Sequence, residues 1–123
     1  MTTLTCKERL EYCSFYIAGS HDVDIPANHR GGALAATHDC INVGCRCWPD
    51  AEIEIVLGDE SDFAPGGDPA LDMRLRTPDN KLLLFDANHP ELLGLAVEAQ
   101  MTRIRVWINH ETEPDHIVII AGD

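Results

Sequence analysis

The chain has 123 residues, and its nine Lys and Arg face 21 Asp and Glu, which gives a formal net charge of -12. This length corresponds to one ordinary domain over residues 1–123, large enough for a self-sufficient apolar core. The acidic balance argues against non-specific binding to nucleic acid or to an anionic membrane, and it permits a basic protein partner.

The first residues contain no recognisable targeting signal. Met1 to Lys7 lacks the positive region followed by an apolar stretch that a secretory signal needs. No apolar run approaches the ~20 residues of a membrane helix. We therefore expect a cytoplasmic, bacterial-type protein whose cysteines are thiols or ligands rather than disulfides. The oligomeric state stays open, with a dimer among the alternatives.

The first half of the chain predicts three strands around an irregular segment. Residues 3–10 predict only a lead-in or a helical turn. Residues 11–18 are rich in aromatics and predict a strand. Residues 21–39 are the least regular part, and a connection of this length is often functional. Residues 41–48 and 51–57 predict two strands that form a hairpin around Pro49-Asp50.

The second half predicts a further hairpin and a closing one. Residues 71–76 and 81–86 are strand-like on either side of a turn, whereas residues 91–100 suit a helix or a strand. In residues 102–108, isoleucine and valine alternate with polar or bulky side chains, and a β-branched run follows at 115–120. The fold class is therefore all-β: an antiparallel β-sandwich or flattened barrel of seven to eight strands, with little helix.

The closing hairpin resembles the end of small bacterial β-sandwich proteins of the competence protein J type, a group that includes a nuclease inhibitor. The resemblance rests on Arg103-Ile104-Arg105-Val106, on Pro114 to Ile119 after a polar turn, and on the aromatic strand Tyr12 to Ile17. It implies the same sandwich fold and suggests an inhibitory function. Because Glu98-Ala99-Gln100-Met101 stands where such proteins tend to have proline and glycine, no functional residue is carried over.

Acidic side chains gather in two predicted loops. They make the candidate binding residues Asp59, Glu60, Asp62, Glu111, Glu113 and Asp115. Acidic inhibitors of basic proteins gain association rate from charge complementarity. We therefore expect a non-catalytic protein-binding module of the inhibitor or immunity type, with no cofactor. The outward residues Arg74, Arg76, Arg103 and Arg105 are expected to form a cross-strand charge ladder with acidic neighbours.

Two other functions are left open by the sequence. His38, Cys40, Cys45 and Cys47 could bind zinc or copper, or Cys40 beside His38 could act as a nucleophile with its base. The favoured interpretation is that Cys45 and Cys47 are small apolar residues that continue a buried strand face, reduced and without metal. The second alternative is a small-ligand site in residues 21–39, which contain His21 and His29.

Overall fold

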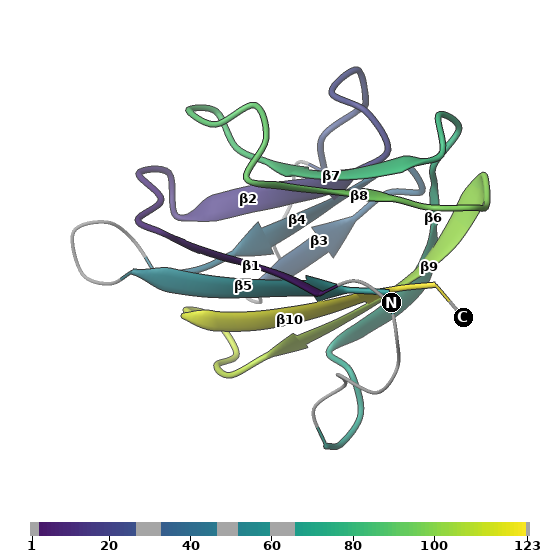
Figure 1. Ribbon diagram of the computed structural model, residues 1–123. Coiled ribbons are helices and arrows are strands. Elements are labelled where there is room, and N and C mark those ends of the chain that lie inside the picture. Colours follow the sequence, from purple (N-terminus) through teal and green to yellow (C-terminus); the bar gives the residue numbers. More distant parts are fainter. Residues whose placement is uncertain (1–2, 27–32, 47–51, 60–65, 123) are drawn as a thin grey trace.

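The computed structural model describes residues 3–26, 33–46, 52–59 and 66–122, which form ten strands in two five-stranded sheets (Figure 1). The first sheet has the order β1 (Thr3–Glu8), β5 (Ile53–Gly58), β10 (His116–Ala121), β9 (Met101–Ile108) and β6 (Leu71–Arg76). The second has the order β3 (Leu34–Ala36), β4 (Cys40–Gly44), β2 (Ser14–Ala18), β7 (Lys81–Phe85) and β8 (Leu93–Ala96). The predicted all-β sandwich is confirmed. No described segment is a helix that could cross a membrane.

The core lies between the two sheets and is made by the alternating residues of their strands. Ile104 and Val106 of β9 are completely buried there, as predicted, together with Phe15 of β2 and Leu84 of β7. A smaller apolar cluster that includes Phe85 covers the outer face of the second sheet. Strands β4 and β7 therefore bury side chains on both faces, which explains why their sequences do not alternate cleanly.

Only the closing hairpin of the three predicted hairpins is correct. Ile119 of β10 lies opposite Val106 of β9 in an antiparallel ladder. By contrast β4 lies in the second sheet and β5 in the first, and the same separation holds for β7 and β6. A short connection can cross from one sheet of a sandwich to the other, and alternation cannot distinguish this crossing from a hairpin. The pairing of β5 with β10 is parallel, so the sheets are not purely antiparallel.

Three local predictions also need correction. Residues 3–8 form strand β1 instead of a helical turn, with Leu4 and Cys6 on its half-buried face. The aromatic strand begins at Ser14, because Tyr12 is in a turn and 61% exposed. Cys13 has a positive φ of 61° and is disulfide-bonded, so it is not a thiol or ligand. The ambiguous residues 91–100 contain strand β8.

The strand directions give the sandwich two distinct ends. The β1–β2 turn, the β7–β8 loop and the β9–β10 loop meet at one end, whereas both termini lie at the other (Figure 1). Each candidate residue therefore lies at the end of the sandwich where its loop is found.

Candidate functional site

The structure places the predicted acidic residues at both ends. Strand β10 runs parallel to β5, so that His116 lies opposite Glu54 and Ile120 opposite Gly58. The β9–β10 loop with its three acidic residues therefore lies at the start of β5, and Asp59 lies beyond the end of β5. Asp59 and the β9–β10 loop do not form one surface. Glu60 and Asp62 lie outside the described residues.

Two side chains give the β9–β10 loop a defined shape. The Nδ1 atom of His110 accepts hydrogen bonds from the backbone N–H groups of Thr112 and Glu113, at 3.2 and 3.0 Å. The Oδ1 atom of Asn109 accepts one from the N–H group of Asp115 at 3.0 Å. The loop is thus held by its own side chains.

The same loop is docked on the rest of the sandwich. The N–H group of Ala33 donates to the carbonyl oxygen of Glu111 at 3.1 Å, and that of Arg46 donates to Pro114 at 3.0 Å. The guanidinium of Arg46 also lies 3.6 Å from the Asp115 carboxylate. Glu111 and Glu113 are exposed, and within the described part of the chain neither carboxylate forms an ion pair. A fixed backbone therefore presents two acidic side chains to solvent.

Other carboxylates lie at this end of the molecule. Glu54 is the second residue of β5, and its carboxylate lies 2.8 Å from Nδ1 of His116 and 3.8 Å from the Lys7 ammonium. Glu8 ends β1, and Glu11 is in the turn that follows. We call this set the acidic end: Glu8, Glu11, Glu52, Glu54, Glu111, Glu113 and Asp115. It outnumbers the nearby Lys7, Arg9 and Arg46.

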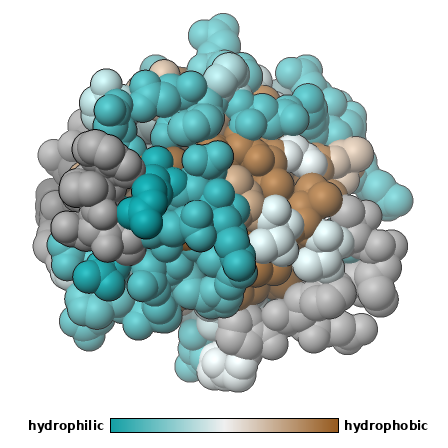
Figure 2. Space-filling view, turned by 60° about the vertical axis from the view of Figure 1, so that its left-hand side comes forward, coloured by the Kyte–Doolittle hydropathy of each residue, from teal (hydrophilic) through white to brown (hydrophobic). Residues whose placement is uncertain are grey.

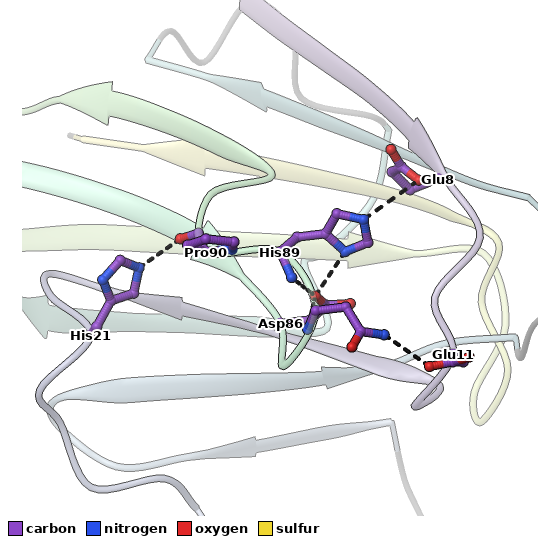
Figure 3. A network of polar contacts seen from close by, with 7 residues as sticks. Glu8, Glu11, His21, Asp86, His89 and Pro90 are labelled. Atoms are coloured by element: carbon purple, nitrogen blue, oxygen red, sulfur yellow. Dashed lines mark hydrogen bonds and ion pairs between the residues drawn. The ribbon is translucent and has the colours of Figure 1, made fainter.

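A buried carboxylate holds the β7–β8 loop beside the acidic end (Figure 3). Asp86 follows β7 directly, and its side chain is 1% exposed. Its Oδ1 atom accepts from the backbone N–H groups of Asn88 and His89 at 2.9 and 2.6 Å. The same atom lies 2.9 Å from Nδ1 of His89. The Oδ2 atom has no hydrogen-bond partner among the described residues.

Asn88 and His89, which Asp86 orients, contact β1 and the turn that follows it (Figure 3). The Nδ2 amide of Asn88 donates to Oε2 of Glu11 at 3.0 Å, and Nε2 of His89 lies 4.0 Å from Oε2 of Glu8. We call these five residues the Asp86 clasp. It joins the two sheets at one end of the open side between β1 and β8.

The sequence reasoning missed this clasp. The only local signal is an Asp followed by Asn and His two and three residues later, directly after an apolar strand. An Asp side chain that accepts from backbone N–H groups two residues on is a known turn motif. Its contacts with Glu8 and Glu11 depend on tertiary packing and carry no signal in the sequence.

The described residues of the alternative metal site, His38, Cys40 and Cys45, do not form a cluster. Cys40 is completely buried in the cluster on the outer face of the second sheet, whereas Cys45 is buried in the core between the sheets. His38 is exposed, and Cys47 lies outside the described residues. No group of three or more His, Cys, Asp or Glu in the described segments could hold a metal ion. The prediction that Cys45 continues a buried strand face is confirmed.

The buried thiols are poorly suited to nucleophilic chemistry. Burial raises the pKa of Cys40 to about 11, with a smaller contribution from the charge of Asp39. Burial raises the pKa of Cys45 to about 12, and the Asp86 charge adds to this effect. Burial also raises the pKa of Cys6. Because the thiolate is the reactive form, these shifts oppose the thiol-enzyme alternative.

The irregular segment 21–39 is described only in part, because residues 27–32 lie outside the described ranges. The Nε2 atom of His21 lies 2.6 Å from the carbonyl oxygen of Pro90, and its ring packs edge-on against Phe85 at 4.7 Å. Val23 packs on the outer cluster of the second sheet. The small-ligand site stays a prediction.

The predicted charge ladder includes an ion pair between β9 and β6. Arg103 of β9 donates from Nε and Nη2 to the two carboxylate oxygens of Asp72, at 2.9 and 2.7 Å. These bonds lower the pKa of Asp72, and the charges of Arg103, Arg105 and Arg74 lower it further. However, the register places Arg74 directly opposite Arg103, a like-charge pair.

Comparison with known proteins finds similarity in structure only. No family model and no curated protein matches the chain. The crystal structure of ComJ, inhibitor of the DNA-degrading activity of NucA, from Bacillus subtilis is similar with a TM-score of 0.58 and 10% identity, over 100% of this chain and 96% of ComJ. A protein described as crocagin biosynthetic gene J matches with a TM-score of 0.48 and 8% identity, over 98% of each chain. The predicted likeness to the competence protein J type is therefore shown for the fold.

Proposed function

We propose that this chain is a non-catalytic inhibitor that binds a basic protein through its acidic end. The observation that carries the proposal is the β9–β10 loop, whose backbone is fixed by hydrogen bonds while the carboxylates of Glu111 and Glu113 remain without ion pairs among the described residues. A preorganised loop loses little conformational freedom on binding. Its unpaired carboxylates are available to the cations of a partner.

Electrostatics support the same end of the molecule. The nearby basic side chains of Lys7 and Arg46 contact Glu54 and Asp115, so their charges are largely balanced locally. The remaining carboxylates produce a negative potential that steers a basic partner toward this end. Such steering raises the association rate more than the final affinity.

The likeness to ComJ suggests the class of partner. ComJ inhibits a DNA-degrading activity, and an enzyme that binds DNA must present positive charge to the phosphate backbone. An acidic end is complementary to such a surface. We therefore propose a nuclease as the partner class, bound where its nucleic acid substrate would otherwise lie.

Affinity capture with matched variants tests this proposal. Wild-type protein, Glu111→Lys/Glu113→Lys and the control Asp79→Lys/Glu98→Lys are immobilised in parallel and exposed to lysate of the cells that encode the chain. The control makes the same change in net charge at exposed positions near the opposite end. A basic protein should be retained by wild type and control and lost from the Glu111/Glu113 variant.

The retained protein is then purified and assayed for DNA cleavage with and without the chain. Dose-dependent inhibition by wild type, and its loss in the Glu111/Glu113 variant, is the expected result. Retention of the same proteins by all three baits, or capture of a protein whose cleavage activity is unaffected, would contradict the proposal.

A further inference from the structure

Four strands form the edges of the two sheets, and three of them are protected against pairing with another chain. Strand β3 has three residues, and β8 has four and contains Gly94. Strand β6 has six residues, but its outward side chains are the charged Asp72, Arg74 and Arg76. Short edges and charged side chains are the usual means of preventing edge-to-edge association.

Strand β1 has less protection than the other three, because it is neither short nor lined by several charged side chains. It has six residues, and its exposed side chains are those of Thr3, Thr5 and Lys7. The ammonium group of Lys7 lies 3.8 Å from the Glu54 carboxylate of the neighbouring strand β5, so the one charge among them is balanced within its own sheet. In the described part of the chain β1 has a partner on one side only, which leaves half of its backbone hydrogen-bonding groups directed outward.

The open side next to β1 is apolar. Leu4 of β1 and Leu92, Leu93 and Val97 around β8 are half-buried and pack against the core from this side. Figure 2 shows an apolar area on the surface of the molecule, with hydrophilic residues along its left and upper sides. The Asp86 clasp closes one end of this β1–β8 seam. At the other end, Val97 lines a hollow of about 470 Å³.

We infer that two copies of this chain associate through β1, antiparallel, with Thr5 of one copy opposite Thr5 of the other. In an antiparallel pair, residues directly opposite each other lie on the same face, so only registers that keep the two faces matched are allowed. This register places Leu4 opposite Cys6 of the second copy on the apolar face. On the polar face it places Thr3 opposite Lys7.

A neighbouring register fits less well. With Cys6 opposite Cys6 of the second copy, the apolar Leu4 would lie against the charged Glu8, which also contacts His89 in the clasp. The Thr5-centred register puts no charged side chain against an apolar one and no like charges in direct opposition. The sequence of β1 is therefore self-complementary about Thr5.

The resulting dimer has a defined geometry. Pairing of β1 with its copy joins the two β1-containing sheets into one continuous ten-stranded sheet and brings the two β1–β8 seams together. Because the strands are antiparallel, the two acidic ends point in opposite directions. Neither acidic end is covered, so the dimer can bind two partners. This consequence rests on the proposed function, but the inference of a dimer does not.

Sedimentation equilibrium of the full chain with charge variants at Thr5 tests the inference. Wild type should convert from monomer to dimer over roughly a hundredfold rise in concentration. Thr5→Lys and Thr5→Glu each place like charges in opposition and should raise the dimer Kd by roughly fivefold or more. An equimolar mixture of the two variants should recover the dimer, since Lys then lies opposite Glu. The control Asp79→Lys should leave the Kd unchanged.

Thermal unfolding of each variant checks the fold, and the mixture keeps the test valid when one variant is destabilised. A wild-type protein that stays monomeric overturns the inference. A dimer that is indifferent to both Thr5 variants, or variants whose mixture does not restore the dimer, overturns it also. Loss of dimer without loss of partner capture leaves the inhibitor proposal intact, so the two can fail separately.

Discussion

Replacement of Asp86 tests how much one buried carboxylate contributes to the fold. Asp86→Ala removes an acceptor for three hydrogen bonds in a site where the side chain is 1% exposed. Hydrogen bonds to charged groups contribute about 1.5–3 kcal/mol each. The Oδ2 atom has no hydrogen-bond partner among the described residues, and its removal offsets part of the loss. We expect a net loss of about 3 kcal/mol in the free energy of unfolding. For a domain of this length that lowers Tm by roughly 10 °C.

The matched control is Asp72→Ala, which removes the bidentate contact with Arg103 on an exposed surface. Water replaces those bonds, so the shift in Tm should be clearly smaller. Asp86→Asn keeps the Oδ1 acceptor, so its Tm should lie between those of wild type and Asp86→Ala. Urea and thermal unfolding measure all three variants. Equal losses for Asp86→Ala and Asp72→Ala would refute the reasoning that burial makes the Asp86 contacts strong.

Three further results are expected. Val106→Asp buries an unpaired carboxylate in the core, and calorimetry should show no cooperative unfolding transition. Cys40 and Cys45 should react with a thiol reagent only after denaturant is added, because both are buried and have raised pKa values. The half-buried Cys6 should react before them. Fast labelling of Cys45 in the native protein would contradict this. The pKa of Asp72 in the folded protein should lie below 3.8, and carbon NMR titration measures this pKa directly. The ionised carboxylate therefore stabilises the fold above pH 3.8, and this stabilisation is lost as the pH falls through the folded-state pKa.

Alternation of side chains predicted most strands but not the sheet to which each belongs. Ile104 and Val106 alternate with arginines because one face of β9 is buried and one is not, and this pattern is local. Whether β4 pairs with β5 depends on whether the connection between them stays in one sheet or crosses to the other. The sequence around Pro49-Asp50 looks the same for a hairpin and for a crossover. Two predicted hairpins were wrong for this reason.

The candidate site was predictable to the extent that it is local. Glu111 and Glu113 lie in a polar loop between two clear strands, and the structure places them on the surface as expected. The separation of Asp59 from that loop follows from the parallel pairing of β5 and β10, which no local pattern reveals. The contact between His89 and Glu8 in the Asp86 clasp requires the two sheets to be in place.

The association rate of the chain with its captured partner tests the central claim most directly. Stopped-flow measurements at increasing salt should show the wild-type rate falling steeply, because exposed charges are screened within about 8 Å at physiological ionic strength. Glu111→Lys/Glu113→Lys should lower the association rate at low salt and make that rate less dependent on salt. Asp79→Lys/Glu98→Lys should leave the association rate and its salt dependence close to those of wild type. An association rate that is unaffected by salt and by the Glu111/Glu113 reversal would show that the acidic end does not bind the partner.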